Sequence, residues 1–299
     1  MVRRVVPPPR DLGIPRRGGR LRGERRPGAP LGGSEVGGSP PRGKAYVSWQ
    51  PRYRVVRIGG STYSKRPFEP QVRELKEAGF DYWEFDLSWI DPTPKLQAEA
   101  TAVAGILPAE TAHLPPPRFT KEDQVRFQRF LDIAAPVGPK FFNIHLMPAK
   151  AAAGVPLDVR TAWLAELVDA AHSRGLTITL ENVEEPLSIL AEVFTRIPRM
   201  KACLDIGHAS LDGDNDRPFQ LLSLIRDRLA LVHAHDNRQG HGEAGDLHLP
   251  FGRGTIQLET ILRSIRDGGF DGHVTLELFT GTKEERTESV AKARAWLNG

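Results

Sequence analysis

Short apolar runs alternate with amphipathic segments from Arg54 to the end of the chain. The runs show no regular polar alternation, which indicates strands buried on both faces, as in a parallel sheet. Between them, apolar residues recur at helical spacing. The predicted strands are 54–60, 80–89, one within 102–117 that ends near His113, 140–146, 176–185, 200–210, 229–235 and 272–279. The predicted helices are 70–78, 120–135, 159–174, 186–194, 218–226, 255–266 and 283–297.

Eight such strands, separated by helices over about 245 residues, predict the α/β class and a (β/α)8 TIM barrel. An open, doubly wound sheet fits less well, because no G-x-G-x-x-G motif follows the first strand. We therefore expect one barrel domain over residues 51–299.

Residues 1–50 have a different composition, rich in Pro, Gly and Arg and poor in large apolar side chains. Such a segment cannot bury enough apolar surface to order itself, so we expect a disordered N-terminal extension. It would serve as a basic arm that contacts nucleic acid or an anionic surface, or it is a disordered extension or upstream sequence translated from a start codon placed too early. Residues 1–44 carry a net charge of +8, which leaves −4 on the remaining residues.

Composition narrows the protein class. The 299 residues are 39% hydrophobic, which is enough for a sizeable core. A single cysteine, Cys203, excludes an internal disulfide and favours a reducing compartment. No apolar run approaches 18 residues and the N-terminus lacks the apolar core of a signal peptide, so we expect a cytoplasmic protein without a membrane partner. The sequence is compatible with a homo-oligomer.

The candidate chemistry lies where the predicted strands end, which in this fold is the catalytic rim. Seven of the nine histidines fall at or just beyond strand ends, and Glu181, Asp205 and Glu277 end three of the strands. Charged residues in buried strands are costly unless they are paired or bind a metal. Imidazole with carboxylate suits zinc, manganese, iron or cobalt, so the pattern predicts a metal site. The seven histidines are His113, His145, His208, His233, His235, His241 and His248.

Five motifs carry a resemblance to a known family: ENV at 181–183, LDIGH at 204–208, HAHDN at 233–237, DLHLPFGRGTI at 246–256 and LEL at 276–278. With them, the chain from about Arg54 to Gly299 resembles the xylose isomerase-like TIM barrels. That superfamily includes sugar-phosphate isomerases and epimerases and type IV AP endonucleases.

The resemblance to the epimerase branch implies one divalent ion (Mn, Co, Mg or Zn) held by Glu181, Asp205, His233 and Glu277. His235 lies two residues after His233, and it could be the metal ligand in place of His233. The endonuclease branch holds up to three zinc ions, so the chain is compatible with one, two or three metals. The additional candidate ligands for metal or substrate are His113, His145, His208, His235, Asp246 and His248.

The leading hypothesis is a metal-dependent isomerase or epimerase of a sugar, sugar phosphate or polyol. The metal would lower the cost of enediolate charge, while Glu181 and Glu277 remove and return a proton. His208 and His145 would orient hydroxyl groups, and Arg238 and Arg253 would hold a phosphate. Aromatic cover for the substrate would come from Trp83, Trp89 or Phe279.

Two alternatives remain. One is a zinc-dependent DNA phosphodiesterase of the AP endonuclease type, which the number of candidate ligands permits. Nucleic acid as a partner is disfavoured, because duplex binding depends on many basic side chains and the barrel segment has a net charge of −4. The other is a regulatory barrel that binds a metabolite, although such a protein would be expected to have lost a metal ligand and none is missing.

Overall fold

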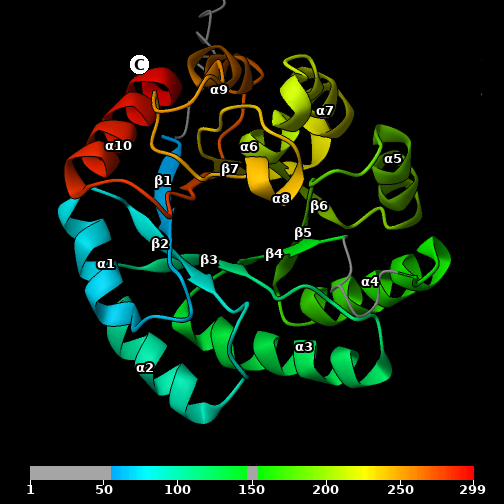
Figure 1. Cartoon of the computed structure of the whole chain (residues 1–299). Helices are drawn as coiled ribbons and strands as arrows, with labels where there is room; N and C mark the ends of the chain where they lie inside the picture. The colour runs from blue at the N-terminus through cyan, green and yellow to red at the C-terminus, as the bar shows by residue number, and fades with distance from the viewer. Residues whose placement is uncertain (1–54, 147–153) are drawn as a thin grey trace, which may run out of the picture. The chain divides into compact units, whose positions relative to one another are not determined.

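The computed structural model describes residues 55–146 and 154–299. Eight parallel strands form a closed barrel in which each strand pairs with its neighbours along the chain and β8 pairs with β1 (Figure 1). This confirms the predicted TIM barrel. The predicted disordered extension over residues 1–50 lies outside the residues that the structure describes. The strands are β1 Arg57–Ser61, β2 Tyr82–Asp86, β3 Ala109–His113, β4 Phe141–His145, β5 Thr177–Glu181, β6 Lys201–Asp205, β7 Leu229–Ala234 and β8 His273–Leu276.

The longer helices form a ring around the barrel, as Figure 1 shows. Their apolar faces pack against the strands; in α9, for example, Leu258, Ile261, Leu262 and Ile265 are buried at helical spacing. The helices are α1 Phe68–Glu77, α2 Pro94–Ala104, α3 Lys121–Ala134, α4 Leu157–His172, α5 Leu187–Arg196, α6 Ile206–Ala209, α7 Arg217–Ile225, α8 Gly242–Gly245, α9 Leu258–Asp267 and α10 Lys283–Asn298, with 3-10 turns η1 Ala135–Val137, η3 Leu211–Gly213 and η4 Arg226–Arg228.

The sequence-based prediction was wrong between residues 94 and 108. It placed a strand within 102–117 and no helix before it, whereas α2 occupies Pro94–Ala104 and β3 begins only at Ala109. The apolar run 102–104 belongs to the last turn of α2, whose buried residues Leu96, Ala100 and Val103 have helical spacing. Thr93 caps this helix by accepting a hydrogen bond from the Leu96 amide, and Pro94 occupies its first position.

The interior of the barrel is more polar than a fully aliphatic core. Because side chains alternate along a strand, Tyr82 and Glu84 of β2 share one face while Trp83 and Phe85 share the other. Tyr82 fills the space beside Gly59, where a Cβ would approach its ring to 2.1 Å, and its hydroxyl lies 3.0 Å from Thr275 Oγ1. Trp83 instead packs against Phe68 of α1, with ring centroids 5.7 Å apart.

An ion-pair cluster lies at the opposite end of the strands from the predicted rim. Glu110 of β3 accepts hydrogen bonds from Arg57 Nε of β1, at 2.8 Å, and lies 2.8 Å from His273 Nε2 of β8. The cluster links three strands near the point where β8 pairs with β1.

Among the residues that the structure describes, none of the helices has the length and apolar character of a membrane span.

Candidate metal centre

Four side chains from adjacent strands converge at the carboxyl ends of β5 to β8. Glu181 ends β5, Asp205 ends β6, His233 lies in β7 and Glu277 follows β8 directly. Each offers one ligand atom, and the four atoms lie within 4.8 Å of one another. His233 Nδ1 lies 3.1 Å from Glu181 Oε2 and 3.2 Å from Glu277 Oε1. The structure therefore brings together the four residues that the family resemblance implied.

Several polar atoms of this group have no hydrogen-bond partner although they are buried. They include Glu181 Oε1, Asp205 Oδ2 and His233 Nδ1. Leaving such atoms unsatisfied costs about 1–3 kcal/mol each, and more for charged groups. A shared divalent cation would satisfy all of them, and the donor set of three carboxylates and one imidazole suits zinc, manganese or a similar ion.

Outer residues hold the four side chains in place. Asn143 donates a short hydrogen bond to Glu181, and Asn182 donates to the backbone carbonyl of Asp205 at 3.0 Å. Glu84 Oε2 lies 3.2 Å from His233 Nε2, so the other ring nitrogen, Nδ1, faces the site. Sequence reasoning missed Glu84. The available signal was a carboxylate within the buried strand FDYWEFD, where a charge needs a partner.

A second set of histidines contacts Glu181 from the neighbouring strands. His113 Nε2 of β3 lies 3.5 Å from Glu181 Oε2, and His145 Nε2 of β4 lies 3.2 Å from Glu181 Oε1. These contacts form two further groups that could hold an ion, one of His113, Glu181 and His233 and one of His145, Glu181 and His208.

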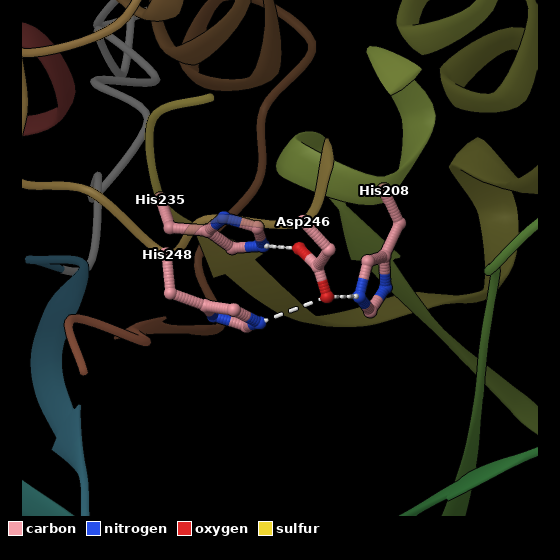
Figure 2. A group of neighbouring side chains, drawn as sticks. All are labelled: His208, His235, Asp246 and His248. Atoms are coloured by element: carbon pink, nitrogen blue, oxygen red, sulfur yellow. Dashed lines mark hydrogen bonds and ion pairs between the residues drawn. The ribbon is translucent and has the colours of Figure 1, made fainter. Parts of the chain in front are cut away.

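A separate group consists of His208, His235, Asp246 and His248, shown in Figure 2. His208 comes from α6 and His235 follows β7, while Asp246 and His248 lie in the loop after α8. The geometry distinguishes the two neighbouring histidines that the sequence left interchangeable. His233 belongs to the group at Glu181 and Glu277, and His235 belongs to the group at Asp246.

Some predicted site residues lie elsewhere. His241 is exposed and pairs with Asp212, so six of the seven strand-end histidines converge and not all seven. Arg253 pairs with Glu285 at 2.5 Å, and Arg238 is exposed. Neither arginine lines the cavity over the site. Trp83 is fully buried against α1 and cannot cover a substrate.

A cavity of about 180 Å³ opens above the converging side chains. It is lined by ionisable residues of the groups described above and by hydroxyl and aromatic side chains. Trp89 and Phe279 are among the lining residues, and their contact with a substrate stays a prediction. The full lining is Ser61, Tyr63, Asp86, Ser88, Trp89, His113, His145, Glu181, His208, Asp246, His248, Glu277 and Phe279.

The two glutamates of the four-residue group differ in acidity. Burial raises the pKa of Glu277 to about 7; the charge of His233 opposes this rise and that of Glu181 adds to it. Burial would also raise the pKa of Glu181, but the neighbouring His145 and His233 hold it well below its usual range. One site thus contains a carboxylate whose pKa is held low by neighbouring histidines and a carboxylate whose pKa is raised by burial.

Curated proteins with similar sequences include sugar epimerases. The chain is 29% identical over 140 residues to the L-ribulose-5-phosphate 3-epimerase UlaE of Salmonella paratyphi C, covering 45% of this chain and 47% of that protein. It is 30% identical over 132 residues to an uncharacterised protein of Methanocaldococcus jannaschii, covering 40% of this chain and 43% of that protein. The chain thus matches less than half the length of these relatives.

Solved structures with the same fold include a D-tagatose 3-epimerase-like protein, with a TM-score of 0.67 and 20% identity over 81% of this chain and 97% of that one. A xylose isomerase-like TIM barrel protein from Mycobacterium smegmatis in complex with magnesium has a TM-score of 0.62 and 15% identity, over 81% and 98% of the two chains. Residues 72–299 match the sequence profile of the xylose isomerase-like TIM barrels. This match covers most of the chain, which therefore belongs to the xylose isomerase-like TIM barrel family.

Proposed function

We propose that this protein is a divalent-metal-dependent isomerase or epimerase of a sugar, a sugar phosphate or a related polyol. The observation that carries the proposal is the pair Glu181 and Glu277, which flank His233 Nδ1 and line one cavity. The epimerases among the relatives support the same reaction class.

The metal would be held by Glu181, Asp205, His233 and Glu277. When bound, Mn, Co, Mg or Zn at this position would supply a Lewis acid that lowers the cost of negative charge on a substrate carbonyl and its neighbouring hydroxyl.

The two glutamates would move the proton. Either Glu181 or Glu277 would accept the proton from the carbon next to the carbonyl, and the other would return it. Glu277, with a pKa of about 7, can donate a proton and take up another one from solvent near neutral pH. Return of the proton to the other face of the same carbon gives an epimer, whereas return to the neighbouring carbon gives an isomer.

The cavity wall would position the substrate. His145 and His208 line the cavity, and the imidazole of His145 can bond to a hydroxyl group. Both ring nitrogens of His208 lie 3.1 Å from carboxylates, of Glu181 and Asp246, so His208 would contact the substrate through its ring face or edge. Trp89 and Phe279 offer apolar faces for the carbon side of a sugar ring or chain. Arg238 and Arg253 have no part in this proposal, because neither lines the cavity.

One observation favours a second candidate, a zinc-dependent phosphodiesterase acting on abasic DNA. The additional ligand groups around His113, His145 and Asp246 could hold further ions beside the four-residue centre, and several zinc ions suit phosphate ester hydrolysis. The charge of the chain opposes this candidate, because the residues after position 44 have a net charge of −4.

The test is proton exchange in deuterated water. Purified protein is incubated with a panel of free and phosphorylated pentuloses and hexuloses, and deuterium incorporation next to the carbonyl is followed by NMR. Glu277→Gln should lower the exchange rate by about 10²–10⁴-fold while the barrel stays folded, because it removes one proton-transfer group.

The matched control is His241→Gln, which changes an exposed residue outside the site and should leave exchange unaffected. Exchange at the wild-type rate in Glu277→Gln would remove Glu277 from the mechanism. If no ketose exchanges and the protein nicks a duplex with an abasic site, the phosphodiesterase is the correct function.

A further inference from the structure

A second cavity, of about 290 Å³, adjoins the cavity over the metal centre. Ser61, Tyr63 and Phe279 line both cavities, so the two are direct neighbours. The rings of Tyr63 and Phe279 lie at this boundary, with centroids 6.2 Å apart. Most of the remaining lining comes from α1, from the end of β8 and from α10, and it includes none of the proposed metal ligands. A molecule held at the metal centre can therefore extend past the two rings into the second cavity.

The two cavities differ in the charged groups that line them. Among the described residues, the lining of the first cavity includes four carboxylates but neither lysine nor arginine. A phosphate group would meet no guanidinium or ammonium group there. The second cavity is lined by two guanidinium groups, Arg66 and Arg286, and by one carboxylate, Glu74. An anionic group therefore fits the second cavity better than the first.

Arg286 of α10 has a pair of donors that no protein group uses. Its Nη1 donates to Glu74 Oε2 of α1 at 3.2 Å, which leaves the edge formed by Nε and Nη2 for another acceptor. Nε is buried and has no hydrogen-bond partner. A buried donor without a partner is costly, and two donors on one guanidinium edge match two oxygens of a phosphate. The unused edge thus indicates an anionic ligand.

Arg66 lies in a loop that α1 holds beside the cavity. Gln71 of α1 accepts a hydrogen bond from the Tyr63 amide at 2.8 Å. The same side chain donates to the carbonyls of Tyr63 and Arg66, at 3.1 and 3.2 Å. The backbone of Arg66 is therefore anchored, while its exposed side chain lines the outer part of the cavity.

The rest of the cavity wall is apolar. Leu75 of α1, Phe80, and Leu276 and Leu278 at the end of β8 line it, and all four are buried. Apolar walls lower the effective dielectric constant. An ion pair between a guanidinium group and an anion is therefore stronger here than on an open surface.

We propose that the second cavity is a phosphate-binding site, formed by Arg286 and Arg66, for the phosphate end of a ketose whose carbonyl lies at the metal centre. The inference rests on the proposed function and narrows its substrates to sugar phosphates. Two phosphate oxygens bind the Nε and Nη2 edge of Arg286, and the carbon chain passes between the cavities at Tyr63 and Phe279. Glu74 competes with the phosphate for Arg286.

Isothermal titration of the full chain with inorganic phosphate tests the site without turnover. The wild type should bind phosphate. Arg286→Gln should weaken binding by about 10–100-fold, because hydrogen bonds between charged partners contribute this much. Arg66→Gln should change the affinity in the same direction.

Glu74→Gln separates ligand binding from a purely structural role of the ion pair. Glu74→Gln and Arg286→Gln break the same contact between α1 and α10, so a structural role predicts that both weaken phosphate binding. A phosphate site predicts opposite effects. Glu74→Gln should tighten binding by roughly two- to tenfold, since it removes the carboxylate that competes for Arg286.

The matched control is Lys283→Gln. Lys283 Nζ lies 2.6 Å from Glu77 Oε2, so this pair also joins α10 to α1, which lie side by side in Figure 1. Neither residue lines the cavity. The variant removes a positive charge from the same two helices and should leave phosphate affinity unchanged.

Deuterium exchange then connects the site with the substrate. The free and phosphorylated forms of each ketose are compared in the wild type and in Arg286→Gln. The variant should raise KM for the phosphorylated form by about 10–100-fold. Exchange of the free form should be unaffected, because a free sugar has no group that reaches Arg286.

The proposal is overturned if the wild type does not bind phosphate, or if folded Arg286→Gln binds it equally well. Weaker binding in both Arg286→Gln and Glu74→Gln would make the ion pair structural. If Arg286→Gln does not fold, the wild type, Arg66→Gln and Glu74→Gln still decide. If phosphate binds as expected but no ketose exchanges in either form, the phosphate site stands and the proposed enzymatic function fails.

Discussion

At the scale of single residues, Glu84 contacts the candidate metal centre. Its carboxylate is completely buried and lies 3.2 Å from His233 Nε2. In metal sites, a carboxylate that receives the far N–H of a ligating histidine fixes the ring orientation and raises its basicity. His233 Nδ1 thereby faces Glu181 and Glu277.

We therefore expect Glu84→Gln to weaken metal binding at the four-residue centre by about 10–100-fold. The glutamine keeps the shape and an acceptor oxygen but loses the charge. Isothermal titration with Mn²⁺ would measure the effect. Unchanged affinity in the folded variant would show that Glu84 does not orient His233.

At the scale of secondary-structure elements, the carboxylate of Glu110 links three strands. It joins β3 to Arg57 of β1 and His273 of β8, at the end of the barrel away from the metal groups. Burial alone would raise the pKa of Glu110, but the hydrogen bonds from His273 and Arg57 hold it below its usual value. Ionised Glu110 thus stabilises the folded barrel.

We expect Glu110→Gln to lower the free energy of unfolding by about 1–2 kcal/mol, discounted because Arg57 is partly exposed. Urea denaturation would measure this loss. Because the folded pKa lies below the unfolded one, the contribution is present above about pH 4.5 and is lost as pH falls through the folded pKa.

Glu110→Gln also serves as the matched control for Glu84→Gln. Both variants neutralise a glutamate that contacts a histidine, but at opposite ends of the barrel. Metal affinity should therefore be unchanged in Glu110→Gln. If the difference in unfolding free energy between the wild type and Glu110→Gln grew below about pH 4, the downward shift assigned to the Glu110 pKa would be wrong.

At the scale of the whole molecule, the barrel brings a large number of ionisable groups into one buried region. Glu84, Glu181, Asp205 and Glu277 are all nearly or fully buried within it. A cation that binds only the folded state stabilises that state by mass action.

Removal of metal by a chelator should therefore lower the thermal midpoint. At a metal concentration 100 times Kd, the lost stabilisation is about 2.7 kcal/mol, which corresponds to a decrease of about 5–10 °C for a domain of this size. Calorimetry with and without chelator would measure it. A midpoint that neither falls on chelation nor recovers on adding metal back would contradict the proposed cation.

The N-terminal segment provides a second prediction at this scale. The closed barrel and the candidate metal groups found among the described residues lie after position 54. Deletion of residues 1–44 should change neither the thermal midpoint nor turnover on a small substrate. A large loss of either would show that the segment contributes to folding or to activity.

The cytoplasmic location and a homo-oligomeric state also stay predictions.

The sequence by itself determined the barrel fold and the end of the barrel at which the candidate ligands lie. Uninterrupted apolar runs separated by amphipathic segments predict a parallel barrel, because both patterns reflect burial that depends on local chain geometry. Glu181, Asp205 and His233 could be assigned to one edge because the carboxyl ends of parallel strands meet there. The helix 94–104 was missed because its three buried residues give only a weak apolar stripe.

Only the tertiary structure decided which side chains share a site. His233 and His235 are two residues apart, yet they belong to different ligand groups. His241 and Arg253 follow in the same stretch but lie outside the cavity, in ion pairs with Asp212 and Glu285. The physical reason is that the distances between side chains of different strands depend on the strand register and on the path of the loops. Neither of these is encoded in the local pattern of apolar and polar residues.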